Sequence, residues 1–139
     1  MLETIKHNNV LIAIIIYSSY KNEGISFVTP QESLLQLGYM ARPAGYRIVP
    51  HTHNPVQRQT VGTQEVLLIK SGVIRIDFYS FEQVFLESRK LSAGDVILLS
   101  GAGHGIDVLE DAVIVEVKNG PFIEGSDKGR FGDKGKKAQ

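Results

Sequence analysis

The residues best suited to chemistry in this sequence are three of its four histidines, His51, His53 and His104. In an extended strand, residues two apart project from the same face about 6.5 to 7 Å apart, so the imidazoles of His51 and His53 can converge on one metal ion. The chain has no cysteine. Any metal ion must therefore be held by nitrogen and oxygen atoms, which favours iron, manganese, nickel, zinc or copper over a structural zinc–sulfur site.

The spacing around the first two histidines is specific. Gly45 is followed, after five residues, by His51-Thr52-His53, and Glu65 is followed, after six residues, by Gly72. These two pieces resemble the first sequence motif of the cupin family. The match predicts that Glu65 shares a site with the two histidines.

A second stretch leads to the third histidine. Gly94-Asp95 is followed by an apolar strand, a glycine-rich turn and then His104, and this order resembles the second cupin motif. The resemblance covers residues 34–118. It implies an all-β fold, a cupin-type double-stranded β-helix or jelly-roll barrel.

The resemblance also implies one divalent transition metal ion, iron, manganese, nickel or zinc, held by His51, His53, Glu65 and His104. The chain departs from the family in the eleven residues 54–64, which replace a shorter spacer and should bulge as a loop at the mouth of the barrel. Two alternatives stay open. In the first, the barrel has lost its metal and the histidines are hydrogen-bonded pocket residues. In the second, one of the four ligands is replaced by water or by Gln57.

Three further side chains are candidates for binding a substrate. Arg47 has the same strand parity as His51, so it points inward if His51 does and could clamp a carboxylate or phosphate. Gln57 and Arg58 lie in the inserted loop, where they could form a lid over the mouth. The alternatives are that Arg47 pairs with an acid at the far end of the barrel and that the loop side chains are merely solvated.

The elements that must position these residues are short strands, because apolar stretches alternate with turns rich in Gly, Pro, Asn and Ser and no long helical pattern is present. Tight turns are expected at Ser71-Gly72 and at Glu110-Asp111. The predicted strands are residues 10–17, 25–29, 34–40, 46–53, 65–70, 73–79, 83–91, 95–99, 104–109 and 112–118.

Composition restricts the class of protein. The chain has 139 residues, which favours one domain, and fifteen basic residues balance fifteen acidic ones. A neutral chain gives no electrostatic reason for nucleic acid or an anionic membrane as a partner. The apolar run 10–16 is too short for a membrane span and lacks the flanks of a signal peptide, so a cytoplasmic location is expected. Residues 1–118 form the predicted barrel, and 119–139 a C-terminal extension whose basic end is solvated and disordered.

The expected function is that of a metal-dependent enzyme acting on a small polar metabolite, of the isomerase, epimerase or dioxygenase type. Residues 63–67 and 74–79 look similar to those of small bacterial cupins linked to polysaccharide and nucleotide-sugar pathways, which makes a sugar or nucleotide sugar a candidate substrate. The alternative is a non-catalytic cupin that binds or senses a small ligand. A homodimer is expected, because the apolar run 10–17 should not remain exposed on a sheet edge.

Overall fold

A computed structural model of the chain describes residues 1–121 and 128–132, and these residues form an all-β structure. All eight regular elements are strands. In chain order they are β1 (Leu2–His7), β2 (Val10–Ile16), β3 (Gly24–Phe27), β4 (Gly38–Ala41), β5 (Glu65–Tyr79), β6 (Phe85–Ser92), β7 (Val96–Leu99) and β8 (His104–Lys118).

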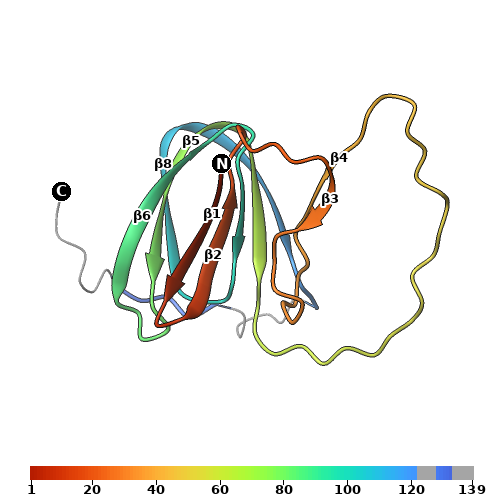
Figure 1. Ribbon diagram of the computed structural model, residues 1–139. Helices are drawn as coiled ribbons and strands as arrows, with labels where there is room; N and C mark the ends of the chain where they lie inside the picture. Colours follow the sequence, from red (N-terminus) through yellow and green to blue (C-terminus); the bar gives the residue numbers. More distant parts are fainter. Residues whose placement is uncertain (122–127, 133–139) are drawn as a thin grey trace.

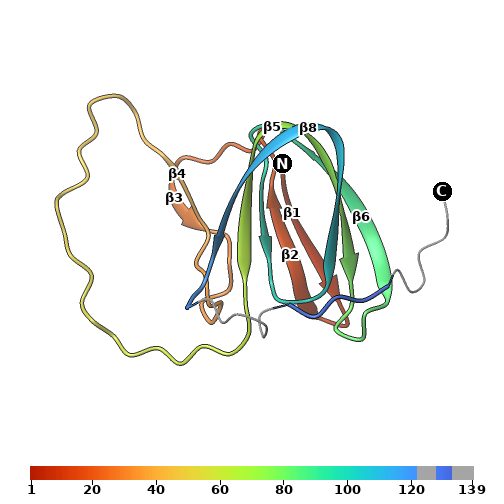
Figure 2. The ribbon, with the colours of Figure 1, turned by 180° about the vertical axis from the view of Figure 1, so that it is seen from behind.

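Six of the strands form one curled antiparallel sheet, a half-barrel (Figure 1). The order along the sheet is β1-β2-β7-β5-β6, and β8 also pairs with β5. The first part of β5 lies between β7 and β8, and its second part lies between β6 and β8. Seen from behind, β5 and β8 run side by side and curve together over the top of the molecule (Figure 2). The all-β prediction is confirmed.

The curl depends on a bend that β5 and β8 make at the same register position. Gly72, at φ +79°, lies against Asp111 and Ala112, and a Cβ at Gly72 would be 2.1 Å from the carbonyl oxygen of Asp111. Only glycine permits this approach at a positive φ. The tight turns predicted at Ser71-Gly72 and Glu110-Asp111 are therefore wrong, because each is the bend of a continuous strand and reverses no chain direction.

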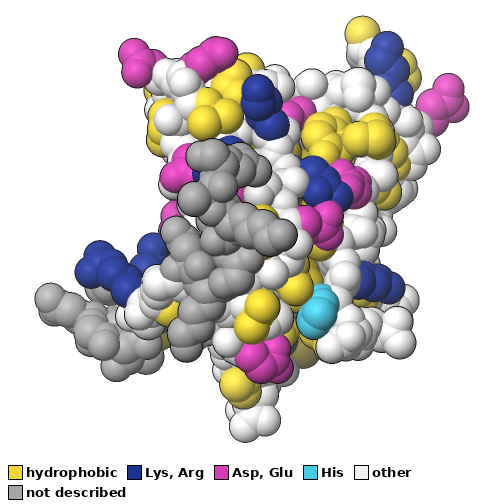
Figure 3. Space-filling model, turned by 90° about the vertical axis from the view of Figure 1, so that its left-hand side faces the viewer, with side chains coloured by type: hydrophobic (Ala, Val, Ile, Leu, Met, Phe, Trp, Pro, Cys, Tyr) yellow, Lys and Arg dark blue, Asp and Glu magenta, His cyan; other side chains and the backbone are white. Residues whose placement is uncertain are grey.

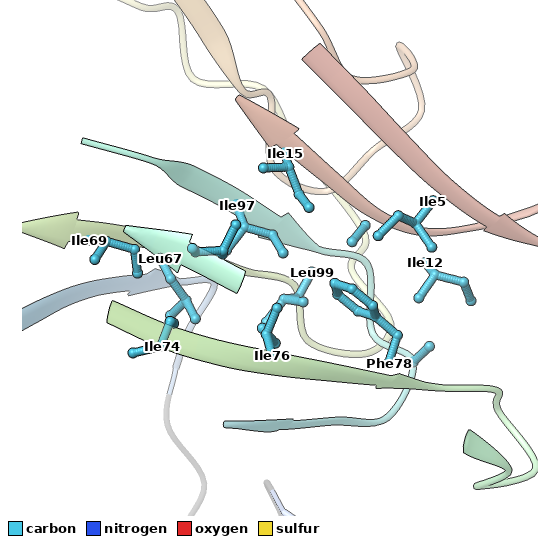
Figure 4. Packing of buried hydrophobic residues seen from close by; sticks show 13 residues of the cluster. Ile5, Ile12, Ile15, Leu67, Ile69, Ile74, Ile76, Phe78, Ile97 and Leu99 are labelled. Carbon is cyan, nitrogen blue, oxygen red and sulfur yellow. The ribbon is translucent and has the colours of Figure 1, made fainter. Parts of the chain in front are cut away.

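The core fills the inside of the curl. Figure 4 shows side chains of β1, β2 and β7 pointing toward those of the second part of β5, with Ile15, Ile97, Ile76 and Phe78 between the two layers. The apolar run predicted as the first strand forms β2, and its residues 12–16 are all buried. The reason given above for a homodimer is therefore wrong, since this run packs inside the molecule. The dimer itself stays a prediction.

β3 and β4 form a separate two-stranded hairpin beside the half-barrel. The segment that follows, residues 42–64, contains no strand, and every residue from 42 to 62 is exposed. In both ribbon views it stands away from the half-barrel as a wide loop (Figures 1 and 2). The predicted strand at 46–53 is thus wrong in this structure, because no neighbouring strand offers hydrogen bonds to it.

The surface carries mixed charge. On the face shown in Figure 3, basic and acidic side chains lie next to one another between small groups of hydrophobic side chains. This agrees with the balanced composition of the chain. Among the described residues, no helix could cross a membrane. The tail predicted to be disordered, 132–139, falls almost entirely outside the described residues.

Candidate functional site

Glu65 and His104 meet at one end of the half-barrel. Glu65 is the first residue of β5 and His104 the first of β8, where it lies opposite Phe78 near the end of β5. Because β5 bends in its middle, its two ends approach each other. The Nε2 atom of His104 lies 3.2 Å from Oε2 of Glu65, and the Glu65 side chain is largely buried whereas His104 is half-buried.

The surroundings keep Glu65 ionised. The hydrogen bond from His104 lowers the pKa of the Glu65 carboxyl below its usual 4.5, and burial opposes this effect. Electrostatic attraction to His104, Lys128 and Lys118 lowers the pKa of Glu65 further. A carboxylate held in its charged form beside an imidazole can accept a proton, orient the imidazole or bind a cation.

The pair opens into a pocket of about 550 Å³. Three basic side chains line the same pocket: Lys118 from the end of β8, and Lys128 and Arg130 from the C-terminal segment. Glu65 is the only acidic residue of the described chain in its lining. Among the described lining residues, positive charges therefore outnumber the one paired carboxylate, an arrangement that attracts anions.

Aromatic side chains make one wall of this pocket. The rings of Tyr79 and Phe131 pack edge to face with centroids 5.1 Å apart. Gly103 lies beneath them, and a Cβ there would be 2.7 Å from Cζ of Phe131 and 3.1 Å from Cβ of Tyr79. The backbone N–H of Tyr79 donates to the carbonyl of Gly103 at 2.8 Å. The absence of a side chain at Gly103 thus lets the C-terminal segment lie against the half-barrel.

The structure does not bring the other two predicted ligands to this pair. His51 and His53 lie on the exposed 42–64 loop, with ring centroids 5.3 Å apart, and neither lines the pocket. The Nδ1 atom of His51 lies 2.9 Å from the carbonyl oxygen of Val49. Within residues 1–121 and 128–132, no three His, Asp or Glu side chains converge in a way that could hold a metal ion.

The predicted substrate-binding residues lie on the same loop. Arg47, Gln57 and Arg58 are exposed and do not line the pocket. Arg58 donates through Nη1 to the carbonyl oxygen of Val56 at 3.3 Å, a contact within the loop itself. Their role in binding stays a prediction that depends on movement of the loop.

The Glu65–His104 pair fits half of a metal site. Two ligand atoms that are each about 2.1 Å from a metal ion, and about 90 to 109° apart around it, are separated by about 3.0 to 3.4 Å. The observed 3.2 Å satisfies this geometry, and an ordinary hydrogen bond satisfies it as well. A complete site would need further ligands from elsewhere.

Sequence reasoning missed the three basic residues and the aromatic wall of the pocket. Lys118, Lys128 and Arg130 belong to no motif, and the last two lie in the C-terminal extension, which was predicted to be separate from the barrel. Only the folded chain shows that this segment crosses the end of the half-barrel. No local pattern in the sequence could have predicted that crossing.

Comparisons with known proteins provide no relative. No family model matches this chain, and neither the curated proteins nor the solved structures include a significant match. The function is therefore argued from the geometry of the pocket.

Proposed function

We propose that this protein binds a small anionic metabolite in the pocket beside Glu65 and His104. The observation that carries the proposal is the lining of the pocket, where Lys118, Lys128 and Arg130 surround the one Glu65–His104 pair. Its volume of about 550 Å³ lies within the range of small-molecule sites, roughly 300 to 1,000 Å³.

The chemistry of the lining selects the class of ligand. Lysine and arginine side chains bind phosphate and carboxylate groups through charge-assisted hydrogen bonds. The aromatic wall of Tyr79 and Phe131 offers an apolar face to a sugar ring or a similar carbon skeleton. A sugar phosphate or nucleotide sugar combines these two features, in agreement with the substrate class expected from the sequence.

Glu65 and His104 are the groups that would act on such a ligand. A charged carboxylate at 3.2 Å from an imidazole is suited to moving a proton to and from a carbon or oxygen of the ligand, as isomerases and epimerases require. Binding without reaction is the alternative that the sequence leaves open.

A metal-assisted form of this function is the second candidate, and the ligand-like separation of Glu65 and His104 favours it. A divalent transition metal ion would supply Lewis-acid polarisation of the bound metabolite. The cupin relationship and its jelly-roll topology belong to this candidate, with His51 and His53 as the additional ligands if the 42–64 loop folds over the pocket.

The anion-binding proposal is tested by calorimetric titration with glucose 6-phosphate, UDP-glucose and neutral glucose. At least one of the two anionic probes should bind and glucose should not. Lys128→Gln and Arg130→Gln should each weaken binding about fivefold to tenfold, the loss of one charge-assisted contact. Lys90→Gln, an exposed charge on β6, is the matched control and should have no effect. Equal binding of glucose, or an equal effect of the control, contradicts the proposal.

The metal candidate is tested separately by elemental analysis of purified protein and by titration with Mn²⁺, Ni²⁺ and Zn²⁺. His104→Ala and Glu65→Gln should each reduce metal content strongly. His51→Ala combined with His53→Ala should do so only if the loop supplies ligands. Full metal content in Glu65→Gln excludes Glu65 as a ligand and leaves the anion pocket as the simpler function.

A further inference from the structure

Among the described strands, β8 has a partner on one edge only. It runs for fifteen residues, His104–Lys118, and pairs with β5 on one side. No strand in the described part of the chain pairs with its other side. A long strand with unpaired backbone groups is a template for adding another strand, and proteins usually cover or interrupt such an edge.

The face of β8 that turns into the half-barrel is also uncovered. Ile106 and Val108 lie directly opposite Ile76 and Ile74 of β5, so they point to the same, inner face. The two β5 residues are fully buried, yet Ile106 is 40% exposed and Val108 is 61% exposed. Ile106 also lines the pocket described above, whereas the exposure of the inward-directed Val108 indicates that no described residue covers the inner face of β8 there.

The chain carries a segment suited to form that wall. Residues 46–61, here called the arm, are all exposed, and they include the apolar Ile48 and Val49 at 52% and 72% exposure. The arm stands clear of the half-barrel in both ribbon views (Figures 1 and 2). Residues 46–53 include Tyr46, Ile48, Val49 and Thr52, which are residue types that favour strands, and no described strand pairs with them.

Charge matches the arm to β8. The arm contains Arg47, Arg58 and two histidines and no acidic residue. β8 contains four acidic residues against a single lysine: Asp107, which already pairs with Arg75 of β5, and Glu110, Asp111 and Glu116. Pairing β8 with the β8 of another copy would instead bring these acids together, because an antiparallel pair centred on Glu110 and Asp111 places like charges opposite each other.

We infer that two copies of this chain exchange arms, each arm adding a strand to the open edge of the other copy's β8. An arm that extends away from its own half-barrel is placed to reach a second copy, and a two-fold arrangement satisfies both arms and both edges at once. Pro50 is compatible with this position because the added strand is outermost, and an edge strand tolerates a missing N–H donor. This dimer does not depend on which ligand fills the pocket.

The experiment uses the absence of cysteine in the natural chain. Protein carrying Val108→Cys is mixed with a tagged, larger version of the protein that carries Ile48→Cys or Val49→Cys. The two arm positions lie on opposite faces of an extended arm, so both faces are tested. The mixture is then oxidised gently. Exchange gives a disulfide between one tagged and one untagged chain. Phe81→Cys, exposed in the β5–β6 turn, replaces Val108→Cys as the control for random collision and should give little of this product.

Two results overturn the inference. One is a mixed product no more abundant than in the Phe81→Cys control. The other is a disulfide that forms only within single chains when Val108→Cys and an arm cysteine are placed on the same chain, since the arm then folds onto its own β8.

A charge exchange gives a second readout by sedimentation equilibrium. Glu110→Lys should weaken the dimer about tenfold, since each of the two symmetric contacts loses a favourable charge pair. Arg47→Glu should do the same. In a mixture of the Glu110→Lys protein with the Arg47→Glu protein, the mixed dimer has opposite charges at both contacts, one in the native order and one reversed. The mixture should therefore dimerise more tightly than either variant alone. A wild-type protein that sediments as a monomer at 100 µM overturns the inference.

Discussion

Arg89 of β6 holds Glu3 of β1 through two hydrogen bonds to the same carboxylate oxygen, 2.9 Å from Nε and 2.8 Å from Nη2. β1 and β6 stand at opposite ends of the main strand order. The contact therefore shows how far the sheet curls, because its two ends come within reach of one ion pair. The other oxygen of Glu3 accepts a hydrogen bond from the hydroxyl of Tyr17 at 2.7 Å.

Loss of this contact should destabilise the half-barrel. Glu3→Gln removes the charge that Arg89 and Tyr17 both use, and we expect the free energy of unfolding to fall by about 1 to 2 kcal/mol, a partly exposed charge-assisted contact being worth less than a buried one. Urea unfolding at pH 7 measures it. Glu23→Gln, an exposed glutamate, is the control, and an equal loss in both variants would contradict a closing role for Arg89.

The same contact predicts acid sensitivity. The hydrogen bond from Arg89, followed by that from Tyr17, lowers the pKa of Glu3 below 4.5 in the folded chain. The stabilisation from a lowered carboxyl pKa is present above the unfolded value and is lost as pH falls through the folded value. The difference in unfolding free energy between wild type and Glu3→Gln should therefore shrink below about pH 4.5. A difference that stays constant down to pH 2 would exclude this linkage.

The hydroxyl of Tyr17 should ionise at a higher pH than that of an ordinary tyrosine. Burial, with a smaller contribution from the hydrogen bond to Glu3, raises the pKa of Tyr17 from 10.0 to about 12. The associated stabilisation is complete below pH 10 and is lost as pH rises through the raised value. Absorbance at 295 nm should show a late component among the five tyrosines. Tyr17→Phe should remove it, and persistence of that component would assign it to another tyrosine.

The shared bend of β5 and β8 should not tolerate a side chain. Gly72→Ala places a Cβ 2.1 Å from the carbonyl oxygen of Asp111, so we expect a loss of about 3 kcal/mol or more or a failure to fold. Gly45→Ala is the matched control, because Gly45 has a similar φ of +82° and open space around it. The control should cost only the backbone strain, about 1 to 2 kcal/mol. Thermal unfolding compares the two, and equal losses would show that the contact with Asp111 can relax.

The packing of residues 128–132 against the half-barrel should depend on Gly103. Gly103→Ala pushes against the ring of Phe131 and the Cβ atom of Tyr79, whereas Gly105→Ala makes only an ordinary contact at 3.8 Å with Tyr79. We expect faster amide hydrogen exchange in residues 128–132 and weaker anion binding in Gly103→Ala alone, because Lys128 and Arg130 lose their place on the pocket. Unchanged exchange in this variant would show that Phe131 does not anchor the segment.

The sequence was a good guide to strands that carry their own apolar pattern. The Ile-rich run of β2 and the strands β6 and β7 are recognisable alone, because their residues meet a core in any all-β arrangement. β1 was missed, since Leu2–His7 mixes charged and apolar residues and becomes a strand through pairing with β2. The turn signals at Gly72 and Asp111 were real, but they are two halves of a single bend.

The site was predictable only where its residues lie on paired strands. Glu65 and His104 were found from their spacing to glycines, and the fold brings them together. His51 and His53 depend on a strand that requires a partner edge, and one chain with its arm extended does not provide it. The basic side chains of the pocket lie far along the sequence from Glu65. The spacing of apolar residues does not predict contacts between such distant segments.

The pairing of β2 with β7 joins two strands that are synthesised at different times. Residues 13–16 of the Ile-rich strand are hydrogen-bonded to residues 96–99, so β2 leaves the ribosome long before its partner exists. At about 5 to 20 residues per second, that interval lasts roughly 4 to 17 s. Until then β1 is the only described neighbour of β2 that has been made, so one edge of this Ile-rich strand stays unpaired in the nascent chain.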